Sequence, residues 1–411
     1  MLSVEQALNS ILAQAKTLGA ETVSLSDSWG RVLAAAVFAR EDAPPFANSA
    51  VDGYAVRAED VRAAGQGTPI VLTVSAEIHA GDAPNLPLEI GTAARILTGA
   101  PVPDGADAIV MQEDTRAEPN GTAKNVSILE AAEIGQHIRP AGEMWRTGDR
   151  ILEAGTLIRA SEIGLLATLG CANIPVYRLP RVAILSTGDE LVDAANENLP
   201  PGKLRDSNRP MLTALVREAG CVLHSSAHVP DNLAQTEAVL RGLADPKTGA
   251  DVIVTAGGVS VGDRDFIKPA LEKLGTLELW RVAMKPGKPI AYGRIGTTQF
   301  FGLPGNPVSA YVTFELFARP MLWAMSGRKP DALARPTVQA TLTEAVSHVP
   351  GRREYVRALT ESNGLHFTTR PVGSQGSGIL RSVTLSNSLL LVPEDAGDLA
   401  VGATVTVLLL F

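Results

Sequence analysis

The most constraining feature of this chain is a regular alternation of short apolar runs and helix-like segments between about residues 179 and 327. The predicted strands are Arg181–Thr187, Cys221–His228, Asp251–Thr255, Ile290–Tyr292 and Phe300–Gly302, and the predicted helices are Asn208–Ala219, Asp231–Leu243, Asp265–Leu274 and one that starts near Pro307. Strands joined through helices imply right-handed crossovers and a mainly parallel sheet covered on both faces. The sequence therefore predicts a central three-layer α/β domain.

The residues before this domain favour β structure. Ser3 and Gln6 form a capping box that predicts a first helix to about Leu18. Strand-like runs separated by glycine and proline turns follow it, as in Thr22–Leu25, Val32–Phe38 and Ile70–Val74. We therefore expect β-rich N-terminal domains.

The residues after the central domain also predict β structure. Gly327 and Pro330 end the last long helix and indicate a domain boundary. Roughly five short strands follow in about eighty residues, which suits a small C-terminal β-barrel or sandwich.

Charge and composition exclude several classes of protein. The net charge of −8 argues against a nucleic-acid binder, because affinity for a phosphate backbone requires clustered positive charge. The amino terminus lacks the basic flank and apolar core of a signal peptide, and no apolar run is long enough to span a membrane. Cys171 and Cys221 have no metal-ligand spacing and are expected to be buried thiols. A cytoplasmic protein without a membrane partner is expected.

Three glycine-rich segments occur near the predicted strands: Thr255–Asp265, Met284–Lys288 and Gly302–Ala310. In a parallel sheet, ligands bind beyond the carboxyl ends of the strands, where backbone amides can approach an anion closely. Lys285 and Lys288 add two ammonium groups to the second segment. Any one segment alone could be a tight turn, but the three together predict an anion-binding pocket.

Acidic residues follow the same strands. Asp189 and Glu190 follow the first strand, Asp231 follows the second, and Asp263 and Asp265 lie in the first glycine segment. Carboxylates beside phosphate-binding amides are typical of a Mg²⁺ site, although capping of the following helices would explain Asp231 and Asp265 individually. The sequence shows no nucleophilic triad, so we predict chemistry on phosphates through positioning and electrostatics.

Several segments, in their joint order, resemble one known family. They are Pro44–Val56 (PPFANSAVDGYAV), Leu97–Pro103 (LTGAPVP), Gly105–Glu113 (GADAIVMQE), Ser186–Glu190 (STGDE) and the three glycine segments. On these motifs the chain is similar over essentially its whole length to the molybdopterin molybdenumtransferases, the molybdenum insertases of molybdenum-cofactor biosynthesis. The resemblance implies Mg²⁺-dependent insertion of molybdate into adenylylated molybdopterin, with release of AMP.

The resemblance also implies a four-part, elongated subunit. Its parts would be a β-rich first domain (residues 1–20 and 46–140), a small second domain (21–45 and 141–178), the α/β molybdopterin-binding domain (179–327) and a C-terminal β-barrel (328–411). The subunit would form a homodimer with its active site between subunits. Possible protein partners are the adenylyltransferase and the molybdoenzymes that accept the cofactor.

Carried over by position, the resemblance and the glycine segments together define the predicted site. The predicted catalytic residues are Asp52, Thr98, Glu190, Asp231, Asp265 and Lys285; the predicted substrate-binding residues are Gly257, Gly258, Ser260, Gly262, Arg281, Lys288, Pro304, Gly305, Asn306, Pro307, Arg352 and Ser377; and the predicted metal ligands are Glu190, Asp231 and Asp265. The resemblance implies that Asp52 and Thr98 face the central domain of the partner subunit. It also implies that Lys285 lines the part of the site where molybdate and phosphate bind.

Two positions depart from the family pattern, and two other functions stay open. Arg281 stands where some relatives have lysine, and Met144 stands where an aspartate is expected after Glu143. A molybdopterin adenylyltransferase shares the central fold but would be a single compact α/β domain. A non-enzymatic scaffold using the same fold would carry a fused adenylyltransferase domain and a long linker. Tungstate and molybdate are not distinguished, because both are tetrahedral dianions of similar size.

Overall fold

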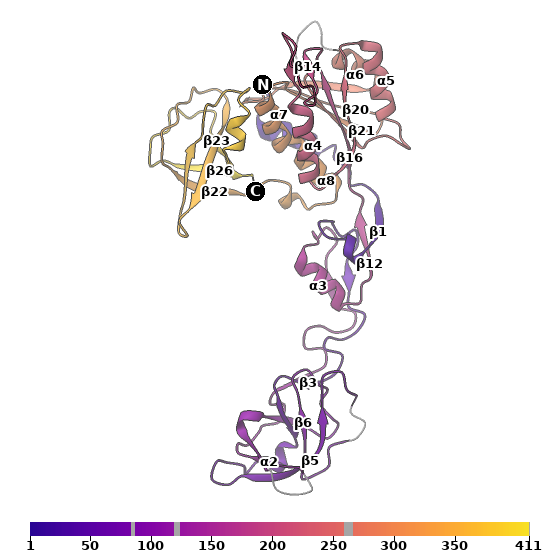
Figure 1. The fold of residues 1–411 in the computed structure, drawn as a ribbon, viewed down its shortest axis with the longest axis vertical. Helices are drawn as coiled ribbons and strands as arrows, with labels where there is room; N and C mark the ends of the chain where they lie inside the picture. The colour runs from indigo at the N-terminus through magenta and orange to yellow at the C-terminus, as the bar shows by residue number, and fades with distance from the viewer. Residues whose placement is uncertain (84–86, 119–123, 259–265, 411) are drawn as a thin grey trace. The chain divides into compact units, whose positions relative to one another are not determined.

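A computed structural model describes residues 1–83, 87–118, 124–258 and 266–410, and the chain divides into two compact units (Figure 1). The larger unit comprises Met1–Ala35, Ala154–Leu166 and Cys171–Phe411, and the smaller unit comprises Ala36–Glu153 and Ala167–Gly170. Among the described residues, the helices are all too short or too polar to cross a membrane.

The larger unit is built around a six-stranded sheet with the order β16-β13-β17-β21-β20-β18. Its strands are β13 (Arg181–Thr187), β16 (Val222–Val229), β17 (Val252–Ala256), β18 (Thr276–Arg281), β20 (Pro289–Ile295) and β21 (Thr298–Leu303). The first four strands in the order are parallel, whereas β20 and β18 are antiparallel to their neighbours. The predicted mainly parallel sheet is confirmed, and β18 is an edge strand that the sequence pattern did not reveal.

Helices cover both faces of this sheet because its central strands are apolar on both sides. The helices are α4 (Asn208–Glu218), α5 (Leu233–Leu243), α6 (Ile267–Leu274), α7 (Pro307–Thr313) and α8 (Arg319–Met325), with the π-helix η3 (Phe314–Ala318) between the last two. Val182 and Ile184 of β13 pack with α4, α7 and α8, whereas Ala183 and Leu185 pack with α5 and α6. Successive side chains of a strand point to opposite faces, so β13 contributes to both layers of the core. The three-layer prediction is confirmed.

The first helix, α1 (Val4–Leu12), is shorter than predicted. Ser3 and Gln6 form the expected capping box, with Gln6 N donating to Ser3 Oγ at 3.1 Å and Ser3 N donating to Gln6 Oε1 at 2.8 Å. The prediction that the helix reaches Leu18 is wrong, because Leu18 N donates instead to the carbonyl of Met325 at 2.8 Å. The backbone of Leu18 therefore pairs with the end of α8 and does not continue α1.

Helix α1 also packs differently from its predicted domain. Val4, Ala7 and Ile11 are buried in the same core as β13, α4 and α8. The four-part division and its boundaries stay predictions, but this packing groups α1 with the central sheet and not with residues 46–140.

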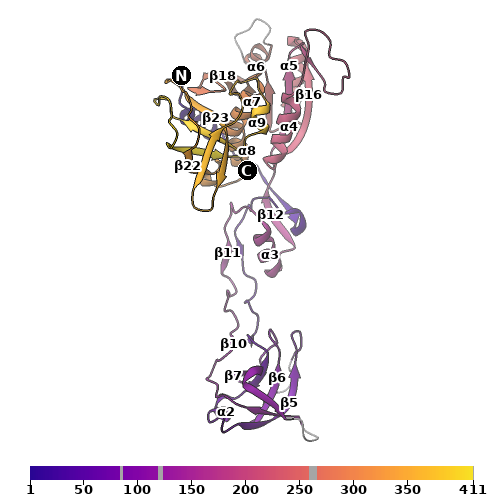
Figure 2. The ribbon, with the colours of Figure 1, turned by 60° about the vertical axis from the view of Figure 1, so that its left-hand side comes forward.

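The last eighty residues form a closed barrel, which Figure 2 shows around β22 and β23. Its strands are β22 (Thr337–Leu342), β23 (Arg353–Ser362), β24 (Phe367–Pro371), β25 (Ser388–Val392) and β26 (Thr404–Leu409). They pair in the order β23-β24-β22-β26-β25, and β25 pairs back with β23, which closes the sheet. The predicted five-stranded barrel is confirmed. A sixth short strand, β19 (Met284–Lys285), comes from the central domain and pairs with the start of β23.

Short elements complete the larger unit, except that the last two residues of α3 belong to the smaller one. They are β1 (Ala20–Ser24), η1 (Leu25–Asp27), α3 (Ala160–Thr168), β12 (Asn173–Tyr177), β14 (Leu191–Val192), β15 (Leu204–Arg205), η4 (Pro330–Ala332) and α9 (Arg381–Thr384). Strand β1 pairs antiparallel with β12, which confirms the strand expected at Thr22–Leu25. Of the two cysteines, Cys221 is buried as expected, whereas Cys171 is half-buried.

The smaller unit is β-rich, as predicted. Its main sheet has the order β7-β4-β6-β5-β9-β8 and mixes parallel and antiparallel pairs. The elements are β2 (Val37–Phe38), β3 (Asn48–Ser49), β4 (Gly53–Val56), α2 (Ala58–Val61), β5 (Ile70–Ile78), β6 (Thr92–Ile96), β7 (Ala108–Met111), η2 (Gln112–Asp114), β8 (Thr115–Glu118), β9 (Asn125–Ile128), β10 (Ile138–Arg139) and β11 (Arg150–Leu152). The strand expected at Val32–Phe38 is wrong for most of its length, since only Val37–Phe38 forms a strand there.

Candidate active site

The carboxyl ends of the parallel strands bring the first and third glycine segments together. Gly257, just after β17, donates its N–H to the carbonyl of Leu303 at the end of β21, at 3.0 Å. A Cβ atom on Gly305 would lie 3.7 Å from the Cα of Gly257. The backbones of the two segments therefore lie in contact, as an amide-lined anion pocket requires.

The second glycine segment meets the helix that follows the third. Gly287 has a φ of 102°, and a Cβ atom there would lie only 2.5 Å from the methyl carbon of Thr313 in α7. Both the backbone conformation and the packing therefore require glycine at this position. The described residues of the three glycine segments therefore lie at the edge of the sheet where β17 and β21 end and β20 begins.

Acidic side chains lie at the ends of the neighbouring strands β13 and β16. Asp189 N donates to Asp231 Oδ2 at 3.3 Å, and Asp231 N donates to Asp189 Oδ1 at 3.2 Å. The alternative that Asp231 caps α5 is wrong, because the side chain of Asn232 accepts the capping bond from Gln235 N. The two aspartates thus face each other at the strand ends, and neither forms a salt bridge among the described residues.

Glu190 and Lys203 flank this acidic pair. A Cβ atom on Gly188 would lie 2.6 Å from both carboxylate oxygens of Glu190, so that carboxylate folds back against Gly188. The Lys203 ammonium donates to the backbone carbonyl of Asp189 at 2.6 Å. Within the described ranges, no group of three histidine, cysteine or acidic side chains is arranged to hold a metal ion. A Mg²⁺ ion needs only one or two carboxylates when phosphate oxygens and water complete its shell, so these residues fit such an ion.

The two lysines of the second glycine segment differ in their surroundings. Lys285 Nζ lies 2.9 Å from Glu354 Oε1, where strand β19 pairs with the start of β23. The Lys288 ammonium forms no ion pair with any described residue. The sequence pattern does not distinguish the two lysines, whereas the fold places the carboxylate of Glu354 beside Lys285 alone.

The barrel brings two more predicted residues to this edge. Arg352 directly precedes β23, which pairs with β19, and it is half-buried. The carbonyl of Ser377 accepts a hydrogen bond from Val308 N, in the first turn of α7, at 3.1 Å. The carry-over of Arg352 and Ser377 is therefore compatible with the fold, although their roles stay predictions.

The remaining predicted residues of the larger unit occupy the same region or lie outside the described residues. Pro304 is buried, Gly305, Asn306 and Arg281 are exposed, and Gly258 and Pro307 are half-buried. Asn306 precedes α7 as expected, but its side chain makes no capping bond. Ser260, Gly262 and Asp265 lie outside the residues that the structure describes.

In the smaller unit, the structure joins Asp52 and Thr98. Asp52 Oδ1 accepts hydrogen bonds from Thr98 N and from Thr98 Oγ1, both at 2.7 Å. These bonds to the charged form hold the pKa of the Asp52 carboxyl below its usual range. Asp52 is thus an exposed carboxylate with a defined orientation.

Three buried side chains near the site were not singled out from the sequence. Asn208 Nδ2 donates to the carbonyl of Gly305 at 2.7 Å and so holds the third glycine segment. Asp206 accepts from Ser186 Oγ, at the end of β13, at 2.5 Å. Glu354 contacts Lys285. Asn208 lies at the start of a predicted helix, but its bond partner is far away in the sequence, so no local signal reveals the role.

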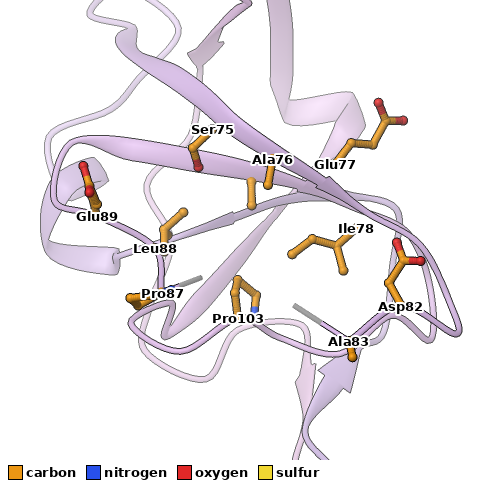
Figure 3. Close-up of a pocket in the computed structure, with 11 residues that line it drawn as sticks. Ser75, Ala76, Glu77, Ile78, Asp82, Ala83, Pro87, Leu88, Glu89 and Pro103 are labelled. Atoms are coloured by element: carbon orange, nitrogen blue, oxygen red, sulfur yellow. The ribbon is translucent and has the colours of Figure 1, made fainter. Parts of the chain in front are cut away.

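A pocket of about 430 Å³ lies in the smaller unit, beside β5 and β6 (Figure 3). Figure 3 shows the apolar side chains of Ala76, Ile78, Leu88 and Pro103 facing it, with Glu77 at its side. None of the predicted site residues lines it. Its apolar and acidic lining is unsuited to a phosphate or molybdate anion.

Three families match successive parts of the chain. Residues 2–170 match the family described as MoeA N-terminal region (domain I and II), residues 183–324 match the probable molybdopterin binding domain, and residues 339–410 match the MoeA C-terminal region (domain IV).

Similar proteins cover nearly the whole chain. A molybdopterin molybdenumtransferase of Haemophilus influenzae is 34% identical over 409 residues, which are 99% of this chain and 98% of that protein. Molybdopterin molybdenumtransferase 2 of Mycobacterium tuberculosis is 40% identical over 392 residues, which are 94% of each chain. The crystal structure of a molybdopterin biosynthesis moeA protein from Pyrococcus horikoshii matches with a TM-score of 0.85, 31% identity and full coverage of both chains.

Proposed function

The chain belongs to the molybdopterin molybdenumtransferase family, and we infer that it is the enzyme that inserts molybdenum into molybdopterin. The observation that carries this conclusion is similarity to such transferases along nearly the entire chain, including each of its three matched regions. We propose further that the molybdenum donor is molybdate, that the acceptor is adenylylated molybdopterin, and that AMP is released.

The site geometry supports this reaction class. The glycine segments meet at Gly257 and Gly305, at the sheet edge where an anionic substrate would lie, and the absence of side chains there would let it approach the backbone closely. Lys285 and Lys288 place ammonium groups at the second segment, where molybdate and the substrate phosphates would be bound. Phosphoanhydride hydrolysis needs mainly positioning and charge stabilisation, which such a pocket provides.

The acidic strand ends would hold Mg²⁺. Glu190 and Asp231 are the described candidates, with Asp189 beside them. The ion would neutralise negative charge on the phosphates of the bound nucleotide. The carboxylates of this chain would hold the positive charge of the ion beside the glycine segments and so keep the phosphoanhydride oriented.

We also propose a cytoplasmic homodimer. In it, Asp52 and Thr98 of one subunit would serve the central domain of the other, as the resemblance implies. The adenylyltransferase that supplies the substrate and the molybdoenzymes that accept the product are the proposed partners. Light scattering coupled to gel filtration would measure the oligomeric state.

The other two functions are not favoured. The match to the MoeA N-terminal and C-terminal regions accounts for the residues on both sides of the α/β domain, which a single-domain adenylyltransferase would lack. Relatives that match this chain over nearly its whole length are named transferases, which favours the enzyme over a scaffold.

One assay tests the proposed function. Purified protein is incubated with adenylylated molybdopterin, molybdate and Mg²⁺, and AMP release is followed, with parallel reactions that omit molybdate or replace Mg²⁺ with a chelator. We expect AMP only in the complete reaction. A folded protein that leaves AMP bound to the pterin contradicts the insertase, and pyrophosphate release from ATP and molybdopterin would indicate the adenylyltransferase instead.

A further inference from the structure

A buried carboxylate lies directly behind one of the two proposed anion-binding lysines. Glu354, the second residue of β23, is 4% exposed, and its Oε1 lies 2.9 Å from the Lys285 ammonium. The side chain of Lys285 is half exposed, so the ion pair joins a buried anchor in the barrel to a cation at the edge of the central domain. The parallel pairing of β19 with β23 places Lys285 and Glu354 opposite each other.

The second oxygen of the same carboxylate is also held. Glu354 Oε2 lies 3.0 Å from His348 Nδ1, and His348 is 6% exposed. An ionised carboxylate only accepts hydrogen bonds, so Nδ1 carries the proton and donates it to Glu354. The other ring nitrogen, Nε2, is buried and has no hydrogen-bond partner among the described residues. Among the described residues, the side chain of His348 therefore makes a single hydrogen bond, and that bond orients Glu354.

The backbone of His348 is fixed independently. Its N–H donates to Asp398 Oδ1 at 2.8 Å, and the same oxygen accepts from Ser347 Oγ at 2.9 Å. The imidazole is thus anchored on the barrel, the carboxylate is anchored on the imidazole, and the ammonium is anchored on the carboxylate.

We propose that Glu354, oriented by His348, is the positioning residue of Lys285 and holds its ammonium where the molybdate or phosphate anion binds. A lysine side chain has four rotatable bonds, and an anion that binds a mobile ammonium must order it first. The ion pair provides this order before the anion arrives. Lys288, which has no such partner, supplies charge without a fixed position. The inference rests on the proposed function in placing the anion at Lys285.

A mutant cycle tests the proposal. Molybdate binding to the full chain is measured by calorimetry, with molybdate alone as the probe, in the wild type, Glu354→Gln, Lys285→Met, Lys288→Met and both double variants. Lys285 and His348 contact different oxygens of Glu354, and glutamine replaces one of these oxygens with an NH₂ donor, so one of the two contacts is lost. We expect Glu354→Gln to weaken molybdate binding about fivefold, the range for loss of one half-exposed ion pair.

The two lysine variants distinguish an effect of Glu354 that acts through Lys285 from a general effect on molybdate binding. Glu354→Gln should retain its full effect in the Lys288→Met background and change binding less than about twofold in the Lys285→Met background. An equal loss in both backgrounds, or no loss in the wild type, overturns the proposal. Absence of any molybdate binding that depends on Lys285 also overturns it. Molybdate binding with this pattern but without AMP release would contradict the proposed function and leave the positioning role supported.

A second pair of variants covers the case in which Glu354→Gln does not fold. His348→Asn keeps a donor near the position of Nδ1, whereas His348→Leu removes it. We expect near-normal molybdate binding for the asparagine variant and a loss of about threefold for the leucine variant, because losing a bond that orients Glu354 affects the anion only indirectly and so stays at the low end of what one hydrogen bond contributes. Similar binding by both variants, each checked for folding by circular dichroism, would show that His348 does not orient Glu354.

Discussion

Two regions of the larger unit hold acidic side chains and differ in what balances their charge. In the π-helix η3, Glu315 is 3% exposed and is paired with Arg319 at 2.6 Å and with Arg335 at 3.1 Å. At the strand ends, the carboxylates of Asp189 and Asp231 accept hydrogen bonds from each other's backbone N–H groups, and no described basic side chain forms a salt bridge with them. Charge that the chain balances internally serves the fold, whereas charge that it leaves unbalanced is available to a cation or a ligand.

The largest effect is expected from breaking the balanced region. Glu315→Gln should lower the free energy of unfolding by about 3 to 5 kcal/mol, because it leaves Arg319 buried without its counter-ion. Denaturant unfolding measures the change. Glu218 also approaches Arg319, at 3.6 Å, but its side chain is 60% exposed. Glu218→Gln is therefore the matched control and should cost less than about 1 kcal/mol. Equal losses would show that burial does not distinguish the two pairs.

The unbalanced region should respond in activity and not in stability. Asp231→Asn is expected to lower kcat/KM for AMP release about 100-fold, because charge stabilisation around a metal supplies several kcal/mol to such reactions. Its free energy of unfolding should stay within about 0.5 kcal/mol of the wild type, since removing one of two facing carboxylates costs no ion pair.

A matched control for Asp231 lies on the same edge. Asp193 forms an ion pair with Arg209 at 2.5 Å and is exposed. Asp193→Asn should keep activity within about twofold. If both asparagine variants lose activity equally, or if Asp231→Asn is destabilised like Glu315→Gln, the distinction between the two regions fails.

Two aspartates of the smaller unit, Asp42 and Asp52, accept hydrogen bonds in the same arrangement, so one can serve as the control for the other. Asp42 Oδ1 accepts from Thr147 N and Oγ1 at 2.7 and 2.8 Å, as Asp52 does from Thr98, and both carboxyl pKa values are lowered by these bonds. Asp52→Asn should lower kcat/KM about tenfold if it is catalytic, a loss typical of one charged contact in a transition state. Asp42→Asn should leave it unchanged. Steady-state AMP release with both variants decides, and parallel losses would make the Asp52 and Thr98 pair purely structural.

The smallest effect concerns a balanced pair in which Arg159 is exposed and Glu162 is buried. Arg159 donates to the carboxylate of Glu162 through its side chain, which, with help from the backbone N–H of Arg159, lowers the pKa of Glu162 to about 2. A carboxyl group whose pKa is lower in the folded state stabilises the fold above its unfolded pKa, near 4.3, and loses that contribution as the pH falls towards 2. Arg159→Ala should therefore reduce stability by less than about 1 kcal/mol at pH 7 and by less still at pH 3. Urea unfolding at both pH values would reveal a wrong sign as a larger loss at pH 3.

Much of the fold and part of the site could be predicted from sequence. Buried strands such as Arg181–Thr187 are continuous apolar runs, and the capping box at Ser3 is a local bond between neighbours in the chain, so both leave a local signal. The place of Leu18 outside α1 could not be predicted, because its N–H bonds to Met325, which is distant in the chain. Likewise, the sequence could name Asp231 as acidic, but only the structure excluded a capping role.

By itself, the sequence determined the α/β order of the central domain, the barrel after it and the glycine segments at the strand ends, because periodicity and turn chemistry act over a few residues. The tertiary structure alone decided which charges are balanced. Lys285 and Lys288 are three residues apart and equivalent in any local pattern, yet β19 meets β23 so that only Lys285 contacts Glu354. An ion pair depends on distance in space, and pairing between remote strands sets that distance.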